Sequence, residues 1–358
     1  EMRYWDSQDS QMNQREIDVF EYAFPEMIQA IKDDYKAYAG SMTDKFFIDL
    51  NISPENISFN YQSSIVTLGS CFSDEIGNKL TLSGFDVQVN PFGTLFHPFS
   101  IANVIHFTLG DRNFNSAKKG DVFLDYSFSG KLYAMSEEEL RTRLITMGDV
   151  LKNQLKQATH LILTFGTSIG YELPNQLFVA NCHQQPASNF VKIISSVEEM
   201  RQQVTSAIDR IKILNPNLQV IVTVSPVRHL KEGLVNNNRS KARLIQLCEC
   251  LENDKAITYF PAYEIFMDVL RDYRFSKIDK SHPSEEAVEY IWDKFKKTYF
   301  TEEVSAISTQ AEAYHRLLNH EFMYPESKEA TLVIQKITVD RENLLSRTPN
   351  LRLKNLPH

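Results

Sequence analysis

Ile65-Val66-Thr67-Leu68-Gly69-Ser70-Cys71-Phe72-Ser73 is an apolar run that ends in a glycine and is followed at once by two nucleophilic side chains. The run predicts a buried strand. A helix is expected directly behind it, because Ser73 can act as an N-cap before the acidic Asp74. In such a strand-to-helix turn, the side chain after the glycine lies at the carboxyl edge of a sheet, beside backbone N–H groups that stabilise negative charge. The stretch therefore predicts an α/β fold with Ser70 or Cys71 as a nucleophile at the sheet edge.

From Phe46 onward, strand-like runs alternate with helical patterns, as in a doubly wound sheet. Runs such as 161–163 and 220–222 are apolar throughout, so helices are expected on both faces of a mostly parallel sheet. An inserted hairpin is expected over residues 121–134, turning at Ser129-Gly130. The fold class is therefore three-layer α/β/α with a mostly parallel, doubly wound sheet. Predicted strands are 65–69, 85–90, 160–165, 218–224 and 256–260, and predicted helices are 74–83, 99–109, 137–157, 197–214, 239–253 and 284–298.

Helical patterns also lie outside this alternation, at both ends of the chain. Residues 15–39 carry an apolar helical pattern that is interrupted near Pro25, and Gly40-Ser41-Met42 follows as a junction. The first segment could pack on the domain or dock on a protein partner. The expected organisation is a helical extension or fused segment over 1–41, an α/β domain over 42–300 and a C-terminal helical cap over 301–358.

A second chemical motif, Asp279-Lys280-Ser281-His282-Pro283-Ser284, lies about two hundred residues further along the chain. A D-x-x-H sequence on one short turn lets the carboxylate fix the tautomer of the imidazole and steady its positive charge. Ser284 then starts a new helix as its N-cap, which clamps the turn. We expect Asp279 to orient His282, and His282 to act as the general base. This requires residues 69–71 and 279–282 to meet in one pocket.

Either Ser70 or Cys71 could be the group that His282 activates. A thiol at a helix N-terminus near an imidazole has a lowered pKa, whereas a serine relies wholly on the neighbouring base. Cysteine, however, is often buried and merely packs, in which case the hydroxyl of Ser70 would be the exposed group. The chemistry favours Cys71, and both residues remain candidates.

Six motifs follow one another along the chain: 69–73, Asn90 to Gly93, Phe165 to Ser168, Ala180 to His183, Ser225 to His229 and Asp279 to Ser284. In identity and order they resemble the GSCFA-domain family of the SGNH/GDSL hydrolase superfamily, over roughly residues 45 to 300. The resemblance implies a flavodoxin-like α/β/α domain with a Ser-His-Asp type of esterase or acyltransferase site. The superfamily's first block is Gly-Asp-Ser, so the register puts Cys71 at the nucleophile position. Its third block has Asn after Gly, where this chain has Thr167.

Further polar groups follow the predicted strands, at the edge where such a sheet binds its ligands. The backbone N–H groups of Gly93, Gly166 and Thr167 could stabilise an oxyanion, and the amide of Asn181 could replace the missing asparagine. Each of these, taken alone, also fits ordinary turn chemistry. The expected oxyanion and substrate-binding residues are Asn90, Gly93, Gly166, Thr167, Asn181, His183, Arg228 and His229.

The composition excludes several classes of protein. A net charge of −8 and a pI near 5.7 argue against a nucleic-acid binder, which usually carries a basic surface. The four cysteines, at 71, 182, 248 and 250, form no C-x-x-C pair and no disulfide framework. We expect no cofactor, and no metal site, because no histidine and cysteine pair has close ligand spacing. With no signal-peptide or membrane-spanning stretch, the expected location is the cytoplasm and no membrane is expected as a partner.

These observations favour an ester hydrolase or acyltransferase acting on an O-acyl ester, carried by a carbohydrate or a similar polar molecule. The expected partner is thus a small-molecule or carbohydrate ester. The alternative is an inactive module that keeps the fold and binds a glycan or a protein, since a fold alone does not establish an activity. Acyl transfer from a thioester such as acetyl-CoA would require a basic pocket near Arg228.

Overall fold

The chain divides into two compact units, Glu1–Asn51 and Ile52–His358. The helical extension predicted over residues 15–39, and the junction after it, lie outside the described residues. The domain boundaries expected near residues 41 and 300 remain predictions. The computed structural model describes residues 57–254, 256–319 and 326–355, together with Ile48, Leu50, Ile52 and Tyr324.

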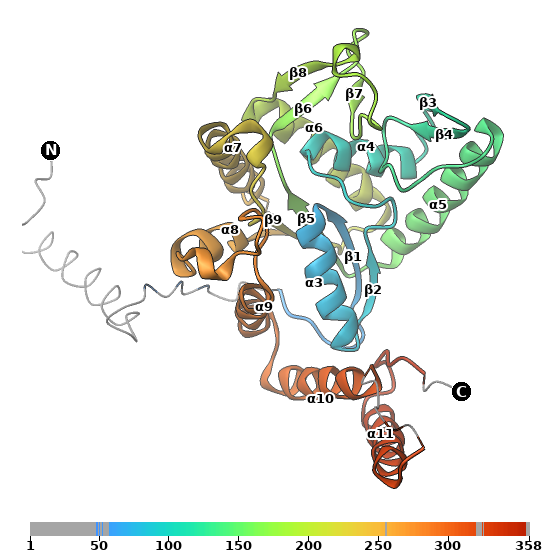
Figure 1. The fold of residues 1–358 in the computed structure, drawn as a ribbon, viewed down its shortest axis with the longest axis vertical. Coiled ribbons are helices and arrows are strands. Elements are labelled where there is room, and N and C mark those ends of the chain that lie inside the picture. Colours follow the sequence, from blue (N-terminus) through green and yellow to red (C-terminus); the bar gives the residue numbers. More distant parts are fainter. Residues whose placement is uncertain are drawn as a thin grey trace, which may run out of the picture. The chain divides into compact units, whose positions relative to one another are not determined.

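A five-stranded parallel sheet forms the centre of the second unit (Figure 1). Its strands are β1 (Ser64–Gly69), β2 (Asp86–Val89), β5 (His160–Phe165), β9 (Gln219–Val224) and β10 (Ile257–Phe260). The spatial order is β10-β9-β5-β1-β2, and every neighbouring pair is parallel. All five strands were predicted, and the doubly wound fold class is confirmed. The connections that follow the neighbouring strands β1 and β5 pass over opposite faces of the sheet, so a crevice for ligands is expected between the carboxyl ends of these two strands.

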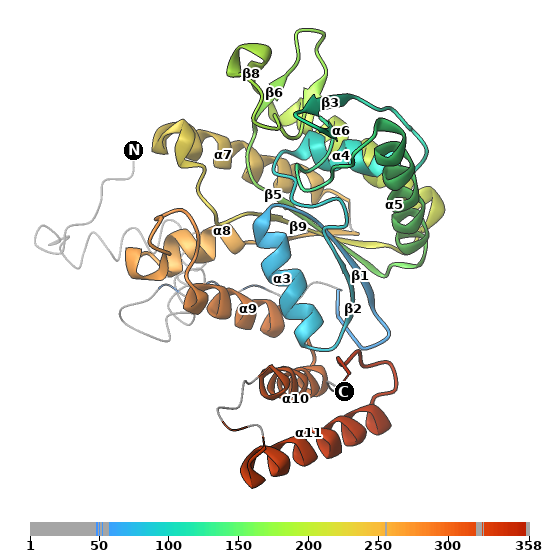
Figure 2. The same cartoon turned by 45° about the vertical axis from the view of Figure 1, so that its right-hand side comes forward.

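Helices cover both faces of the sheet, as the apolar strands require (Figure 2). On β1, Val66 and Leu68 pack with one layer, made of α4 (Pro98–Thr108), α5 (Glu137–Gln157), α6 (Val197–Leu214) and α7 (Leu234–Leu251). The alternate residue Ile65 packs with the other layer, made of α3 (Cys71–Leu82), α8 (Ala262–Glu264) and α9 (Glu285–Tyr299). The six predicted helices are confirmed. One cap was wrong: α3 begins at Cys71, because its N-cap is Ser70 rather than Ser73.

Smaller elements decorate the carboxyl edge. The hairpin predicted over residues 121–134 was wrong: the paired strands are β3 (Ser116–Lys119) and β4 (Val122–Asp125), which turn at Gly120, whose φ is 58°. Phe128, expected in a strand, stacks on Phe92 at 5.1 Å between ring centroids and belongs to the core. A three-stranded antiparallel sheet was not predicted: β7 (Phe178–Val179), β6 (Ile169–Glu172) and β8 (Val191–Ile194). Short helical turns are η1 (Ala187–Asn189), η2 (Leu230–Glu232), η3 (Ile265–Val269) and η4 (Tyr273–Phe275).

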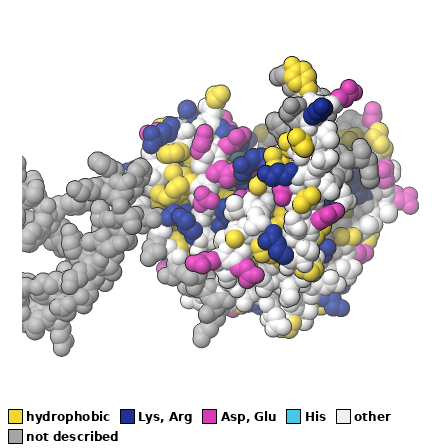
Figure 3. Space-filling view, turned by 90° about the horizontal axis from the view of Figure 1, so that it is seen from below, with side chains coloured by type: hydrophobic (Ala, Val, Ile, Leu, Met, Phe, Trp, Pro, Cys, Tyr) yellow, Lys and Arg dark blue, Asp and Glu magenta, His cyan; other side chains and the backbone are white. Residues whose placement is uncertain are grey.

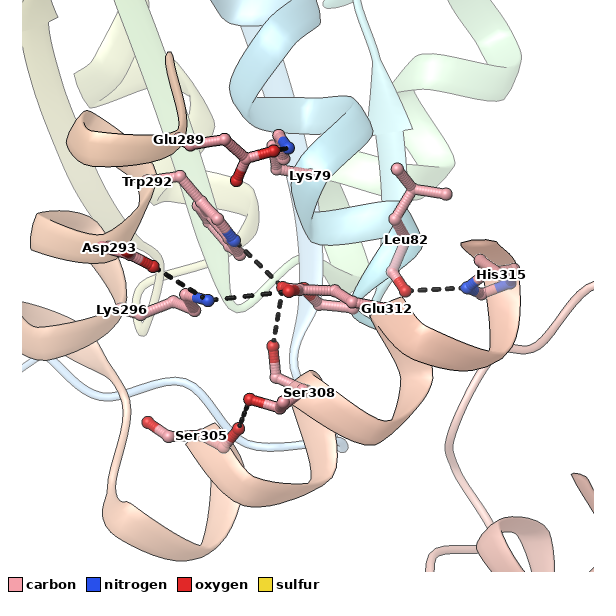
Figure 4. Close-up of polar contacts among 12 residues, drawn as sticks. Lys79, Leu82, Glu289, Trp292, Asp293, Lys296, Ser305, Ser308, Glu312 and His315 are labelled. Carbon is pink, nitrogen blue, oxygen red and sulfur yellow. Dashed lines mark hydrogen bonds and ion pairs between the residues drawn. The ribbon is translucent and has the colours of Figure 1, made fainter. Parts of the chain in front are cut away.

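Two further helices, α10 (Glu302–Leu318) and α11 (Lys328–Arg347), lie at the end of the unit beyond α3 and α9 (Figures 1 and 2). A half-buried carboxylate attaches α10 (Figure 4). Oε1 of Glu312 accepts hydrogen bonds from Ser83 Oγ at 2.7 Å, Trp292 Nε1 at 3.0 Å and Ser308 Oγ at 3.1 Å. Burial raises the pKa of Glu312, but the hydrogen bonds from Ser83, Trp292 and Ser308 and the charge of Lys296 together lower it by more. The carboxylate therefore ties α10 to the ends of α3 and α9.

We expect Glu312→Ala to lower the free energy of unfolding by about 3 kcal/mol at neutral pH, because the buried donors of Ser83 and Trp292 lose their acceptor. The folded pKa of Glu312 is depressed, so its contribution is present above the unfolded pKa and is lost as pH falls. Urea denaturation of both proteins at neutral and acidic pH measures this. The control is Glu303→Ala, an exposed carboxylate on the same helix. Equal losses in the two variants would contradict the assignment.

Charges of both signs are mixed on the face of the molecule drawn in Figure 3. Lys and Arg side chains lie among Asp and Glu side chains on the face seen from below in Figure 3. Within the described part of the chain, none of the helices combines the length and the apolar character that spanning a bilayer requires.

Candidate active site

The turn between β1 and α3 fits closely against the neighbouring strand β5. Gly69 has a φ of 148°, and a Cβ atom there would lie 2.3 Å from the carbonyl oxygen of Thr164. The N–H of Ser70 donates to this same carbonyl at 3.1 Å, and the N–H of Leu95 donates to Gly69 O at 2.8 Å. Glycine is therefore required at position 69, and it brings the next two side chains to the carboxyl edge of the sheet.

Asn90 holds this turn in place through hydrogen bonds at both ends of its side-chain amide. Its Oδ1 accepts from the N–H of Gly69 at 2.8 Å, and its Nδ2 donates to Asp74 Oδ1 at 2.6 Å and to Ser70 O at 3.4 Å. The residue is buried. The expectation that Asn90 contacts substrate is therefore corrected, because both ends of its amide are bound within the protein.

Ser70 and Cys71 have different surroundings. The Ser70 side chain is the N-cap of α3: its Oγ accepts from the N–H of Phe72 at 3.3 Å, and the residue is 1% exposed. Cys71 is the first residue of the helix and is only half-buried. The sulfur is therefore the more accessible of the two nucleophiles.

The Cys71 thiol does not have the lowered pKa expected at a helix N-terminus. Burial raises its pKa, and the nearby carboxylates of Asp74 and Glu75 raise it further, against a lowering by the ammonium of Lys241. Cys71 therefore rests as a thiol and needs a base to ionise it.

The predicted carboxylate–imidazole pair is present on the loop before α9. His282 Nδ1 lies 2.6 Å from Asp279 Oδ2, and Asp279 Oδ1 accepts from the N–H groups of Ser281 at 2.9 Å and His282 at 3.0 Å. These bonds, led by that from the His282 N–H, lower the pKa of Asp279 to about 2, so it stays ionised. With Nδ1–H donating to a carboxylate, Nε2 of His282 is left as a proton acceptor. Ser284 caps α9 as predicted.

The end of β9 holds this loop in place. The N–H of Arg228 donates to Ser281 O at 3.0 Å, and its Nη1 donates to Lys280 O at 3.1 Å. Beside the loop lies a cavity of about 360 Å³, lined in part by Arg228, Tyr263 and Tyr273. Arg228 therefore binds the loop and also lines the cavity beside it.

Two buried residues, Lys241 and His229, interact electrostatically with members of the two predicted motifs. Lys241 acts on the pKa of Cys71, and both Lys241 and His282 act on that of His229. Burial, aided by these two positive groups, lowers the pKa of His229 to about 4, so its ring is neutral. Its Nε2 is buried and has no hydrogen-bond partner within the described structure. The geometry agrees: His229 directly follows Arg228, which binds the Asp279–His282 loop, and its Nε2 would lie 3.2 Å from a Cβ atom at Gly166, whose carbonyl accepts from Lys241.

Three expected oxyanion donors are engaged elsewhere. The N–H of Gly93 donates to Asn90 O at 2.7 Å within a turn, where Gly93 has a φ of 75°. The N–H groups of Gly166 and Thr167 both donate to the carbonyl of Phe96, at 2.7 and 3.1 Å. This corrects the expectation that the three groups stabilise an oxyanion.

Asn181 and His183 belong to another cavity, of about 490 Å³, beside the β3–β4 hairpin. Asn181 Oδ1 accepts from the N–H of His183 at 2.8 Å, and His183 Nε2 lies 2.7 Å from Asp125 O. Burial lowers the pKa of His183, so the neutral ring donates from Nε2 to that carbonyl. Within the residues that the structure describes, the hydrogen bonds of Asn181 and His183 do not reach Cys71 or His282. The expectation that they complete the same site is therefore not supported.

Sequence reasoning missed Lys241, which is 1% exposed on α7. Its Nζ donates to Gly166 O at 2.7 Å and to Ser225 O at 2.6 Å, the carbonyls at the ends of β5 and β9. The signal was present in the helical spacing, because Lys241 falls on the buried face shared by Leu244 and Cys248. A lysine in such a stripe is rarely buried without a partner.

Across the described ranges, no cluster of three or more His, Cys, Asp or Glu side chains is placed to hold a metal ion.

Comparison with known proteins adds a family and two distant structural likenesses. The model of the GSCFA family matches residues 64–295. No curated protein matches the chain. Among solved structures, a carbohydrate esterase family 3 from Talaromyces cellulolyticus is 8% identical, with a TM-score of 0.32, over 69% of this chain and 99% of that one. The Clostridium thermocellum family 3 carbohydrate esterase is 14% identical, with a TM-score of 0.31, over 70% and 98%.

Proposed function

Because the chain belongs to the GSCFA family, we propose that it is an esterase or acyltransferase of the SGNH type, with Cys71 as nucleophile and His282 as general base. The observation that carries the proposal is the 2.6 Å contact between His282 Nδ1 and Asp279 Oδ2, which leaves Nε2 free to take a proton. In support, the loop that carries this pair is bound by Arg228, which follows the carboxyl end of β9, and Cys71 follows the carboxyl end of β1 in the same parallel sheet.

In the proposed reaction, His282 Nε2 takes the proton of the Cys71 thiol as the sulfur attacks the ester carbonyl carbon. The tetrahedral intermediate collapses, the C–O bond breaks, and the proton on His282 passes to the departing alcohol. Water, or an acceptor alcohol, then attacks the thioester with His282 again as base. The products are an acid or a new ester, together with the free thiol. Asp279 stays ionised throughout and stabilises the imidazolium.

An oxyanion would be stabilised at the N-terminus of α3. The N–H of Cys71 is the first of the helix, and it lowers the pKa of the Cys71 thiol, as a donor directed at negative charge on that sulfur does. Helix N-termini present such N–H groups and a positive partial charge to anions. In the proposed site, the N–H of Cys71 takes the role that was expected of Gly93, Gly166 and Thr167, whose N–H groups donate to backbone carbonyls.

The substrate we propose is an O-acyl ester of a polar carrier such as a carbohydrate. The cavity beside the His282 loop has exposed Asp268, Asp272 and Tyr273 in its wall, with Arg228 between aromatic rings. Carboxylates and guanidinium groups hydrogen-bond hydroxyls, and an aromatic face packs on a sugar ring. Arg228 and Arg271 balance the two carboxylates of this wall, so the cavity suits a neutral, hydroxylated carrier better than a strongly anionic one.

The proposal is tested with the full chain, p-nitrophenyl acetate and an O-acetylated monosaccharide. We expect acetate release above the buffer rate, and loss of that activity in step with alkylation of Cys71 by iodoacetamide. Adding a second alcohol distinguishes transfer from hydrolysis, because a transferase yields the new ester.

The second candidate is an inactive module that binds a glycan or a protein. It is favoured by the raised pKa of Cys71 and by the separate cavity around Asn181 and His183. If no ester is turned over and neither iodoacetamide nor a fluorophosphonate labels the chain in a His282-dependent way, this candidate replaces the first.

A further inference from the structure

The cavity beside the β3–β4 hairpin is formed by segments that are distant in the sequence. Its walls include Lys119 and Val122 of the hairpin, Gly130 and Tyr133 from the stretch after it, and Asn181 and His183 from the stretch after β7. Its volume of about 490 Å³ falls within the range of roughly 300–1,000 Å³ that is usual for ligand pockets. The proposed ester chemistry uses none of these residues.

His183 brings a buried hydrogen-bond acceptor to this cavity. The residue is 4% exposed, and its neutral ring donates from Nε2 to Asp125 O at 2.7 Å. Nδ1 is therefore an acceptor, and it has no hydrogen-bond partner within the described structure. It faces Gly130 in the cavity wall, because a Cβ atom at that position would lie 3.4 Å from it. A buried acceptor is costly to leave unpaired, so a ligand donor is expected there.

Asn181 places a donor beside this acceptor. Its Oδ1 accepts from the N–H of His183 at 2.8 Å, so Nδ2 is the end of the amide that faces Gly130, again 3.4 Å from the position of a Cβ atom there. A hydroxyl group matches this pair, because it can donate to Nδ1 and accept from Nδ2. A carboxylate or phosphate oxygen has only lone pairs and would repel Nδ1. The two nitrogens therefore select a hydroxylated ligand rather than an acid.

The backbone holds these side chains in a conformation that non-glycine residues seldom adopt. His183 and Gln184 have φ values of 50° and 57°, and the N–H of Gln185 closes the turn by donating to Cys182 O at 2.9 Å. Left-handed backbone at non-glycine residues is strained, and such strain concentrates at ligand sites. The orientation of the His183 ring is thus set by the protein before a ligand binds.

The rest of the cavity suits a sugar ring. Tyr133 is 50% exposed, and Val122 and Leu124 add apolar side chains to the wall. Pockets for small ligands combine such apolar surfaces with a few fixed polar groups. Lys119 Nζ donates to Gln184 Oε1, and an ammonium group has three donors, so it can also bind a ring hydroxyl.

We infer that this cavity is a binding site for a sugar, in which a hydroxyl group bridges His183 Nδ1 and Asn181 Nδ2 while the ring packs against Tyr133. The site is separate from the proposed Cys71 and His282 chemistry, and the sugar bound in it is not the reacting group. The inference does not rest on the proposed function, because it holds for an active esterase and for an inactive module alike.

The test uses the full chain with 15N-labelled histidine rings, titrated separately with glucose, galactose and mannose. We expect the Nδ1 signal of His183, assigned from the backbone of the same residue, to move and saturate with at least one sugar as it accepts a hydrogen bond. The ring of His282 reports on the proposed active site in the same spectra. A response at His282 alone, or no response at His183 with any of the three sugars, would overturn the inference.

Gly130→Ala tests the contact itself. The φ of Gly130 lies outside the left-handed region and the new methyl group would meet its nearest neighbours at 3.4 Å, so the fold should accept it, while the methyl group covers both nitrogens. We expect the sugar dissociation constant measured at His183 to rise about tenfold or more. The matched control is Lys131→Ala, an exposed neighbour outside the cavity wall, which should bind sugar like the unaltered protein. Equal affinities in the Gly130 and Lys131 variants would refute the proposed site.

If Gly130→Ala fails to fold, Tyr133→Ala takes its place, with Met135→Ala as control, since both side chains are well exposed on the same stretch. Weaker sugar binding is expected only in the Tyr133 variant, and unchanged binding there overturns the inference. Ester turnover is recorded on the same samples. Sugar binding at His183 without turnover refutes the proposed function alone, and turnover without sugar binding at His183 refutes this site alone.

Discussion

Replacing Cys71 by alanine is expected to lower kcat for ester hydrolysis by about 10³-fold or more, with the fold intact. Cys71 is half-buried at the start of α3, whereas the hydroxyl of Ser70 is covered and accepts a hydrogen bond from Phe72. Removing the sulfur therefore removes the accessible nucleophile. Steady-state hydrolysis of p-nitrophenyl acetate, with circular dichroism to check folding, measures the effect.

Ser70→Ala is the matched control, one residue away. It should keep most of the ester turnover but lower the free energy of unfolding by about 1 kcal/mol, because α3 loses its N-cap. The reverse pattern, with Ser70→Ala inactive and Cys71→Ala active, would reassign the nucleophile to the serine.

His282→Ala is expected to reduce ester turnover by about 10²- to 10⁴-fold, the usual contribution of a positioned general base. Asp279→Asn should approach the same loss, because an amide can no longer hold Nδ1 of His282 as a donor and leave Nε2 as the acceptor. Both side chains are substantially exposed, at 42% and 50%, so neither change should unfold the domain. The readout is kcat at several pH values for each variant.

Asp254→Asn provides the control for the Asp279 variant. Asp254 is an exposed carboxylate before the amino end of β10, and it accepts from the N–H of Ala256 at 3.0 Å, much as Asp279 accepts from the N–H of Ser281. The partners that the structure describes for its side chain, Ala256 and Lys212, include no imidazole. We expect turnover of this variant to match that of the unaltered protein. Full activity in His282→Ala would rule out His282 as the general base, whichever residue is the nucleophile.

The alternation of strands and helices could be predicted because apolar periodicity and caps are local properties. Helices α5 and α6 have the predicted bounds, and Ser284 caps α9 as expected. The Asp279–His282 pair could also be predicted from the sequence, because the two residues lie on one turn. These features depend on residues a few positions apart, for which the sequence carries the information directly.

The oxyanion donors could not be predicted, because their availability depends on a distant backbone group. A single carbonyl, that of Phe96, takes the N–H groups of both Gly166 and Thr167. Nothing in the motif around residues 165–168 indicates where residue 96 will lie. The displaced hairpin turn has a similar cause, because Phe128 packs on Phe92 in the core rather than alternating along a strand.

The C-terminal helices have a practical consequence for anyone who shortens this protein. Gly84, just after α3, lies so close to Leu351 that a Cβ atom would come within 2.4 Å of it, and the N–H of Arg352 donates to Gly84 O at 2.7 Å. A fragment limited to the family-matched region, 64–295, would therefore expose apolar side chains at the end of α3 to solvent. It would also remove Glu312, which accepts the hydrogen bond from Trp292 Nε1. Crystallisation or enzymology on a minimal version should retain the polypeptide through residue 355.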